Sequence, residues 1–489
     1  MILVGNDMKV IKNYLYNASY QLLALLLPLI TTPYVSRVLG PNGVGINAYT
    51  NSIAQYFILV ANLGIALYGN REIAYVRKNK EKLTQVFWEI QLLKIVTTLF
   101  SLLLFLSFLF IYSEYHVYLI LQSINIFAVV FDISWLYMGI EDFKKTVLRN
   151  TLIKVISIFL IFIFVKDKSD VGIYIFILAI STLVGNLTLW PFLRETLASS
   201  VKISALHPFR HLIPTLALFI PQIATQIYLV LNKTMLGVFQ GPKFSGYYNY
   251  SDSLVKMVLA LATALGTVML PHIANAYSNK EFEKVNNLLY KSFDYVTAIS
   301  VPMAFGLAGV AHTLVPLFYG KGYYPVGTAM TIEAVVIIMI SWSGTIGTQF
   351  LLPINRIKAY TTSVLLGAFT NIILNLPFIY FWGLNGAMIS TVISEAVVTM
   401  YQVSYVKRIV SLNSLFRYTF KYIVAGIIMF LPIFWISLQW PATLLTLIIE
   451  VLIGIAIYAS FMCIFRRDVI NYCISFIKKR KQGVKSDEY

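Results

Sequence analysis

The sequence has little charge and almost no cysteine. Asp, Glu, Lys and Arg together make up 12% of its 489 residues, whereas 58% are hydrophobic. This composition is too apolar and too poor in charge for an ordinary soluble protein. The two cysteines, Cys463 and Cys473, form no ligand-spaced motif, which argues against a disulfide scaffold or a zinc site. We therefore expect no metal and no cofactor.

Catalytic motifs are also missing. The sequence contains no phosphate-cradling P-loop, so the chain is not expected to use ATP itself. Its five histidines are scattered, and no long outer loop carries paired carboxylates or a histidine cluster. A membrane polymerase or ligase acting outside the cell would need such a loop. We predict no catalytic residues and no enzyme.

Long apolar segments fill the chain instead, and most windows of about twenty residues could span a bilayer. They predict an all-α polytopic membrane protein with about fourteen transmembrane helices. The predicted spans are 13–38, 46–68, 86–111, 117–140, 147–165, 171–191, 212–238, 247–272, 288–316, 326–352, 360–381, 384–406, 418–438 and 442–465.

Basic residues test this topology. Of the 38 Lys and Arg residues, 29 fall on one side of the predicted membrane, five on the other and four within spans. By the positive-inside rule the N- and C-termini are cytoplasmic. The net charge of +17 is explained by this membrane face, so nucleic acid is not an expected partner. No cleavable signal peptide is apparent, and we expect residues 1–7 to be dispensable.

An internal repeat organises the spans. Residues 40–55, GPNGVGINAYTNSIAQ, align with residues 241–256, GPKFSGYYNYSDSLVK, at an offset of 201. Six spans in each copy give both copies the same orientation, so the repeats are parallel. We predict an N-lobe at 1–205 and a C-lobe at 206–410, each with six helices. Two further helices and a basic cytoplasmic tail occupy 411–489.

Polar residues follow one helical face in corresponding spans. Asn51, Gln55 and Asn62 align with Asp252, Lys256 and Thr263, and the preceding span carries Gln222, Gln226 and Lys233 on one face. These faces predict the walls of an aqueous cavity between the lobes. Hydrogen bonding between helices inside each lobe is the alternative. The predicted substrate-binding residues are Arg37, Asn51, Gln55, Gln222, Gln226, Lys233, Asp252 and Lys256.

Charged residues within spans are costly and need a cavity or a partner. Lys256, Lys233 and Arg37 are the candidates for contacting an anionic group on a substrate, although Arg37 could instead anchor to lipid phosphate. Asp252, one turn from Lys256, is placed to neutralise it in part. Asp132, Glu333 and Glu395 are candidates for coupling to H⁺ or Na⁺, or are paired structural acids. The membrane potential alone is a further possible driving force.

The N-terminal stretch LPLITTPYVSRVLGPNGVGINAYTNSIAQYF, followed by GNREIAYVRKNKEKL, resembles a known family. It resembles the polysaccharide-biosynthesis flippases, the Wzx-like branch of the multidrug/oligosaccharidyl-lipid/polysaccharide exporter superfamily. The residues that carry the resemblance are Pro33, Tyr34, Ser36, Arg37, Leu39, Gly40, Gly43, Gly45, Arg71, Glu72 and Ala74. The resemblance extends over essentially the whole chain.

This resemblance implies a flippase in the bacterial plasma membrane. Such proteins move an undecaprenyl-diphosphate-linked oligosaccharide from the inner to the outer leaflet by alternating access, with a cationic lumen around the diphosphate. The lumen of lipid II flippases is rich in arginine, whereas this chain places mainly lysines there. Expected partners are the lipid-linked oligosaccharide and membrane lipids, and we expect a monomer. The alternatives are an ion-coupled multidrug antiporter of the same superfamily and a membrane polysaccharide polymerase or ligase.

Overall fold

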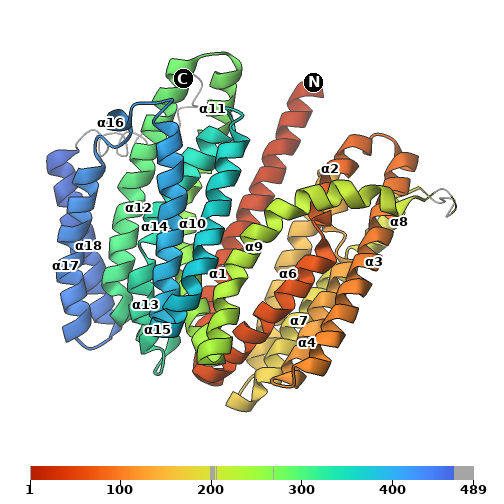
Figure 1. Cartoon of the computed structure of the whole chain (residues 1–489), viewed down its shortest axis with the longest axis horizontal. Coiled ribbons are helices and arrows are strands. Elements are labelled where there is room, and N and C mark those ends of the chain that lie inside the picture. The colour runs from red at the N-terminus through yellow and green to blue at the C-terminus, as the bar shows by residue number, and fades with distance from the viewer. Residues whose placement is uncertain (1, 199–203, 205, 268, 467–489) are drawn as a thin grey trace. The chain divides into compact units, whose positions relative to one another are not determined.

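The computed structural model describes residues 2–198, 204, 206–267 and 269–466, although some helical side chains, including those of 2–22 and 220–225, are not described. Within these ranges every regular element is a helix, which confirms the all-α prediction. The chain divides into two compact units, Met1–Tyr247 and Tyr248–Tyr489, called unit 1 and unit 2 below (Figure 1).

Unit 1 is built from long helices joined by short turns. Its elements are α1 (Ile2–Asn62), α2 (Ile65–Val76), α3 (Lys80–Ile111), α4 (His116–Phe131), α5 (Ser134–Gly139), α6 (Phe143–Phe164), η1 (Lys168–Asp170), α7 (Val171–Leu187), η2 (Trp190–Phe192), α8 (Leu193–Thr196), η4 (Pro208–His211) and α9 (Leu212–Gln240). The second half of α1 packs against α3 and α4, and α4 packs against α7. Trp135 stacks on Phe87 in the core between α2, α3 and α5, with ring centroids 5.5 Å apart.

Unit 2 begins within α10 (Pro242–Thr267). It continues through α11 (Met269–Ser278), α12 (Phe282–Tyr319), α13 (Tyr324–Glu333), α14 (Val336–Ser343), the π-helical segment η5 (Gly344–Leu351), α15 (Ile357–Val406), α16 (Leu412–Leu415), α17 (Thr419–Gln439) and α18 (Leu444–Phe465). α12 packs along α17, and α17 packs against α18. Its core includes Phe293, which contacts the rings of Trp342 and Phe416.

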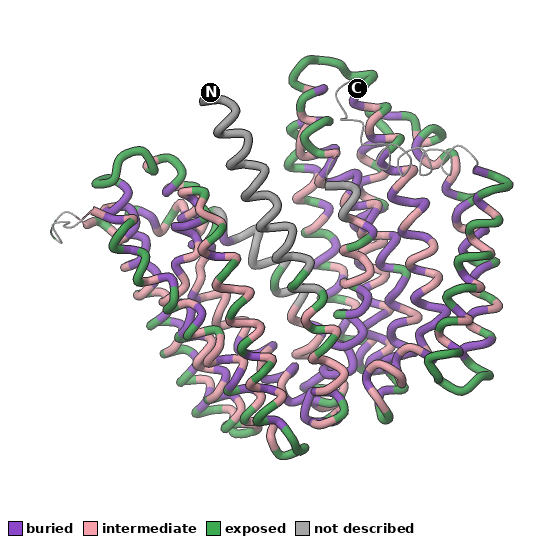
Figure 2. Tube along the Cα trace, turned by 180° about the vertical axis from the view of Figure 1, so that it is seen from behind, coloured by how far each residue is buried: buried purple, intermediate pink, exposed green. Residues whose placement is uncertain are grey.

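Many large apolar side chains remain exposed on these helices. Leu103 on α3, Phe159 on α6, Leu431 on α17 and Ile455 on α18 are each about 60% exposed or more. Figure 2 shows exposed positions alternating with buried ones along the helices of each unit. A soluble monomer rarely exposes so much apolar surface, whereas lipid solvates it without cost.

Two breaks within long helices coincide with boundaries between predicted spans, whereas the breaks between α1 and α2 and between α4 and α5 fall inside predicted spans. Among the described residues, ten helical segments are long and apolar enough to cross a membrane. Two of them, Leu26–Val76 and Ile357–Val406, are interrupted by glycines with non-helical backbone angles, Gly40 and Gly383. The predicted spans separate at these same places. The count of fourteen spans stays a prediction, because length and composition do not define a membrane crossing.

The two Gly-Pro motifs of the repeat have the same backbone conformation. Gly40 has φ 67° and ψ 177°, and Gly241 has φ 92° and ψ 160°. Residues with a Cβ rarely adopt a positive φ, so both positions favour glycine. Pro41 and Pro242 then open the following helices, where a proline costs no hydrogen bond. This shared geometry supports the internal repeat.

The boundary between the compact units falls later than the predicted lobe boundary. It lies between residues 247 and 248, whereas the repeat places the division between 205 and 206. The difference arises because α9 packs against α1 and α2 and is therefore grouped with unit 1. The division into 1–205, 206–410 and 411–489 follows the sequence repeat and stays a prediction.

Candidate functional site

A polar cavity of about 440 Å³ lies within unit 1, between α1, α4 and α7. Carboxamide side chains dominate its lining: Asn47, Asn51, Gln55, Asn62, Gln122, Asn125 and Asn186. Asp132 and Thr182 complete the polar part, and Ile58, Val129 and Leu178 supply the apolar part. We call it the amide cavity. All of its lining residues fall within predicted membrane spans, where polar groups are rare and mark functional sites.

Hydrogen bonds between the amides hold the walls of the cavity. The Gln122 side-chain amide on α4 donates to Asn47 Oδ1 on α1, 3.3 Å away, and accepts from Asn125 Nδ2 at 2.9 Å. Gln55 Nε2 donates to Asn51 Oδ1 at 3.4 Å. Asn186 Nδ2 on α7 donates to the backbone carbonyl of Ala128 on α4 at 2.8 Å. The amides therefore link all three helices.

Asp132 lies at the C-terminal end of α4, beside a buried lysine. Lys94 Nζ on α3 donates to the Asp132 backbone carbonyl at 2.6 Å, and Lys94 is fully buried. The Ser134 backbone N–H donates to Asp132 Oδ1 at 3.0 Å. The lysine balances the acid electrostatically, as buried charges in a membrane require. Asp132 therefore contributes a polar group to the cavity wall, and Lys94 compensates its negative charge.

A second polar cluster lies in unit 2. Lys256 Nζ and Asp252 Oδ1, one turn apart on α10, form an ion pair at 2.7 Å. The neighbouring Ser251 hydroxyl donates to Glu333 Oε2 on α13 at 2.6 Å. Glu333 is buried and lies close enough to interact with both Asp252 and Lys256. The expected neutralisation of Lys256 by Asp252 is thus present in the structure.

The Lys256 side chain is 45% exposed, whereas the Asp252 side chain is 9% exposed. The cation therefore has an accessible side, while both acids are enclosed. An incoming anion can therefore replace these two carboxylates as the partner of the Lys256 ammonium group. This is the chemistry that an anionic substrate group requires.

The remaining predicted residues lie elsewhere. Arg37 is exposed and donates to the Pro33 carbonyl of its own helix at 3.0 Å. Lys233 is half-buried on α9, and its carbonyl accepts from Ser245 Oγ. Gln226 is exposed on α9, and the side chain of Gln222 lies outside the described residues. Glu395 is half-buried on α15, where its carbonyl accepts from Thr399 Oγ1.

The structure thus brings Asn51, Gln55 and Asp132 to the amide cavity, and Asp252, Lys256 and Glu333 to the unit 2 cluster. Their functional roles stay predictions. Sequence reasoning missed Gln122, Asn125 and Asn186. A signal was present, because Asn125 and Asp132 are seven residues apart and share a helical face with Gln122. The same holds for Thr182 and Asn186, which are four residues apart.

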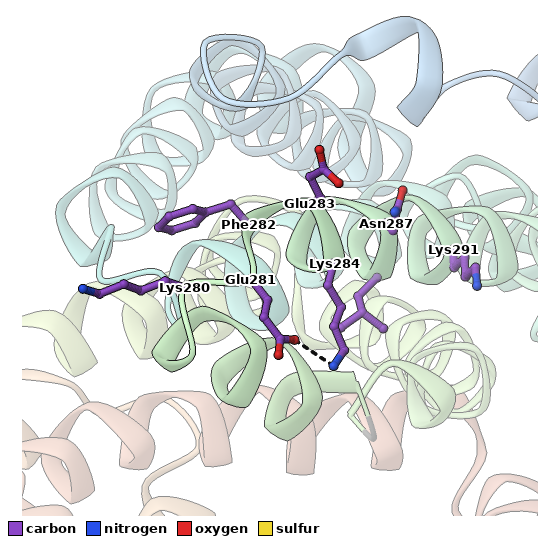
Figure 3. A pocket seen from close by; sticks show the side chains of 8 residues that line it. Lys280, Glu281, Phe282, Glu283, Lys284, Asn287 and Lys291 are labelled. Carbon is purple, nitrogen blue, oxygen red and sulfur yellow. Dashed lines mark ion pairs between the residues drawn. The ribbon is translucent and has the colours of Figure 1, made fainter. Parts of the chain in front are cut away.

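A larger hollow lies at the turn between α11 and α12. Its volume is about 810 Å³, and the residues labelled in Figure 3 surround it, with Glu281 paired to Lys284 at 2.8 Å. Three lysines and two glutamates line it, so the charges largely compensate. We interpret it as a charged surface at a helix turn. In the part of the chain that is described, no three His, Cys, Asp or Glu side chains come together as a metal site would need.

A family model described as "Polysaccharide biosynthesis protein" matches residues 10–276, which is more than half of the chain. The chain belongs to the polysaccharide biosynthesis protein family. The matched region extends from within α1 into α11 and contains the whole amide cavity and the Asp252–Lys256 pair. The family resemblance predicted from the N-terminal motif is confirmed.

Comparison with individual proteins agrees with the family match. The chain is 27% identical over 406 residues to a "Putative O-antigen transporter" of Escherichia coli (strain K12), covering 82% of this chain and 98% of the relative. It is 22% identical over 161 residues to "Lipid II flippase MurJ" of Bacillus subtilis (strain 168), covering 32% of this chain and 30% of that protein. These relatives are named transporters and flippases, so the prediction that this family member is not an enzyme is confirmed.

Solved structures show the same fold. "Lipid II flippase MurJ, inward closed conformation" superimposes with a TM-score of 0.75 at 18% identity, covering 94% of this chain and 100% of that one. An inward-facing multidrug resistance MATE family transporter of the MOP superfamily gives a TM-score of 0.60 at 14% identity, covering 80% and 95%. The family member described here is therefore a multi-pass membrane protein with the fold of this superfamily.

Proposed function

We propose that the chain moves an undecaprenyl-diphosphate-linked oligosaccharide from the inner to the outer leaflet of a bacterial plasma membrane. The observation that carries the proposal is the amide cavity, a hydrogen-bonding site within membrane spans of a chain whose relatives are named O-antigen transporters and flippases. Sugars and a diphosphate cannot cross hydrocarbon unaided, so a path lined by polar groups is required.

The diphosphate of this cargo needs cations along the path. Lys256 is the best placed, because its side chain is 45% exposed and its ammonium group is held by the Asp252 carboxylate. Arg37 and Lys233 are proposed as further contacts. An anionic diphosphate reaching Lys256 would displace the Asp252 carboxylate, which must then find another partner or a proton.

The displaced acid offers a route to ion coupling. Glu333 and Asp252 are two enclosed carboxyls beside one lysine, and two neighbouring acids bind a cation or a proton more readily once that lysine is engaged elsewhere. We assign H⁺ or Na⁺ uptake to this pair, with Asp132 and Glu395 as structural acids. The drug antiporter alternative is less well supported, because no aromatic side chain lines the amide cavity for a hydrophobic cation.

We propose that both termini lie in the cytoplasm and that a single chain forms the transporter. The charge distribution of 29 basic residues against five supports this orientation. We propose a monomer, with the amide cavity lined by residues of α1, α4 and α7.

The test is deletion of the gene, followed by measurement of lipid-linked oligosaccharide on each leaflet. Complementation uses wild type, Lys256→Met and Lys284→Met. Lys284 is a matched control because it also pairs with an acid close to it in the sequence, Glu281 at the N-terminus of α12. It lies at the surface turn between α11 and α12, away from the unit 2 cluster. We expect accumulation on the inner leaflet, cleared by wild type and Lys284→Met and not by Lys256→Met.

Two other outcomes would distinguish an error in the proposed function from an error in the role of Lys256. If deletion leaves the leaflet distribution unchanged, the chain does not flip this cargo and the proposed function is wrong. If the intermediate accumulates and Lys256→Met clears it as well as wild type, the function holds and Lys256 has no role in it.

A further inference from the structure

The polar lining of the amide cavity is almost without charge. Seven carboxamides, one threonine and one acid line it, and no Lys or Arg is among its lining residues. The acid, Asp132, has a buried lysine beside its backbone carbonyl. Two cations contact the wall without lining the cavity, since Lys94 donates to the Asp132 carbonyl and Arg149 Nη1 donates to Asn186 Oδ1 at 3.3 Å. A diphosphate entering this cavity would therefore find no cation among the lining residues, which is unfavourable in a low-dielectric site.

We infer that the amide cavity binds the sugar rings of the cargo, whereas the diphosphate is bound by cations outside it. This inference rests on the proposed function and assigns one part of the cargo to one site. The ligand class is a neutral polyhydroxylated ring attached to a lipid diphosphate.

Carboxamides suit such a ligand because their hydrogen-bonding groups match those of a hydroxyl. Each Asn or Gln offers two N–H donors and a carbonyl oxygen with two lone pairs, and each sugar hydroxyl both donates and accepts. Asn51, Gln55 and Asn125 are half-buried on the wall of the cavity, so part of each amide faces its interior. A charged ligand would gain less from such groups than from a lysine or an arginine.

The walls are also pre-organised. Gln122 is 2% exposed and is fixed by Asn47 on one side and Asn125 on the other. These bonds use only part of the hydrogen-bonding capacity of each amide, which leaves donors and acceptors for a ligand. A site whose side chains are already oriented loses less entropy on binding than a flexible one.

The size of the cavity fits a short glycan segment. At about 440 Å³ it falls within the range of about 300–1,000 Å³ typical of small-molecule sites. No aromatic ring lines it, so recognition depends on hydrogen bonds rather than on stacking. Replacing amides with isosteric apolar side chains should therefore remove sugar recognition and keep the shape.

The experiment measures binding to the purified full chain in nanodiscs. The probes are bare undecaprenyl diphosphate, the same lipid carrying a short neutral oligosaccharide, and the free oligosaccharide. The variants are wild type, Asn51→Leu/Gln55→Met and the control Gln91→Met. Gln91 is a buried amide of the same unit that bonds the Val130 carbonyl at 2.7 Å and does not line the cavity.

We expect wild type and Gln91→Met to bind the sugar-bearing lipid more tightly than the bare lipid. In Asn51→Leu/Gln55→Met this preference should fall by on the order of tenfold, since hydrogen bonds to two amides are lost. Binding of the bare lipid should not change. Asn125→Asp is a second variant, which keeps the side-chain size and adds a charge, and it should weaken sugar binding while leaving the bare lipid unaffected.

Three results would overturn the inference. They are equal weakening of both lipids by the cavity variants, no effect on either lipid, and free oligosaccharide binding as tight as that of the linked form. If wild type binds neither lipid diphosphate, the proposed function fails and the inference fails with it. That result is distinct from the other three because in each of those wild type still binds a lipid diphosphate.

Discussion

Gly45 and Gly246 lie face to face, so that a Cβ added to Gly246 would be 2.8 Å from the Gly45 Cα. The two glycines occupy equivalent positions in the sequence repeat, 201 residues apart. A Cβ added to Gly45 would lie 2.3 Å from the backbone oxygen of Pro242. The start of α10 therefore packs against α1 through two copies of the same motif, at a distance that leaves no room for a side chain.

Replacing either glycine should destabilise unit 1. For Gly246→Ala we expect the free energy of unfolding to fall by about 1–3 kcal/mol, because the methyl group meets backbone that cannot rotate away. Thermal unfolding followed by tryptophan fluorescence in detergent measures this. Gly172→Ala is the control, since its nearest neighbour would lie 3.6 Å away. Equal midpoints for the two variants would contradict the close approach.

Much of the fold could be predicted because the bilayer imposes a simple rule. Apolar segments of sufficient length form helices, and the breaks between them fall where Gly or Pro cannot continue a helix. Gly40 and Gly383 illustrate this, as each separates two predicted spans. The compact-unit boundary was not predictable in this way. It depends on the packing of α9 against α1, and sequence spacing carries no information on that contact.

The candidate site was predictable only where polar residues form a stripe on one helix. Asn51 and Gln55 stand four residues apart, and helical periodicity alone identifies their shared face. The pairing of Lys256 with Asp252 follows from the same rule. Asn186 could not be connected with Asn51, because only tertiary packing brings α7 beside α1. Helical periodicity identifies the polar residues that share one face of a helix, whereas a cavity depends on how several helices pack together.

Glu89 connects the segment before α9 to α3. Its buried carboxylate lies 2.9 Å from His211 Nε2 and accepts from the His207 backbone N–H at 3.0 Å and from Gln85 Nε2 at 3.1 Å. The Tyr68 hydroxyl on α2 lies 2.7 Å from His211 Nδ1. One acid therefore fixes the chain that enters α9.

Removing this acid should loosen the start of α9. Glu89→Ala removes the carboxylate that contacts the buried His211 and accepts from Gln85 and the His207 backbone N–H, and we expect a loss of on the order of 1–3 kcal/mol in unfolding free energy. Limited proteolysis between residues 197 and 212 should become faster. Glu72→Ala serves as control, since among the described residues Glu72 forms an ion pair with its exposed neighbour Arg71 alone, and surface pairs contribute little. Protease resistance equal to wild type in Glu89→Ala would show that the contact does not hold this segment.

The ion pair on α10 predicts opposite effects of its two members. If Lys256 binds the diphosphate, Lys256→Met should weaken binding of bare undecaprenyl diphosphate. Asp252→Asn should tighten it by about tenfold, because the lysine loses its competing anion. Binding is measured by titration in nanodiscs at two salt concentrations, and the difference should shrink at high salt. Weaker binding in both variants would mean that the pair acts as a structural unit instead.

Arg466, at the C-terminal end of α18, contacts residues of α12 and α17. Its guanidinium group donates to both carboxylate oxygens of Asp294, at 3.0 and 2.8 Å, and lies 3.6 Å from the centre of the Tyr418 ring. The Tyr422 hydroxyl donates to Asp294 Oδ1 at 2.8 Å, the oxygen that also accepts the 3.0 Å hydrogen bond from Arg466. The fork geometry and the ring contact both require arginine rather than lysine.

Arg466→Lys should therefore destabilise unit 2 although it keeps the charge. We expect the unfolding free energy to fall by about 1–3 kcal/mol, since one of two charge-assisted hydrogen bonds and the stacking on Tyr418 are lost. Arg417→Lys is the matched control, because exposed Arg417 lies over the same ring at 5.2 Å and is not among the residues bonded to Asp294 here. Thermal unfolding of both variants gives the comparison. A midpoint in Arg466→Lys as high as that in Arg417→Lys would mean that charge alone, and not the planar fork, fixes the end of α18.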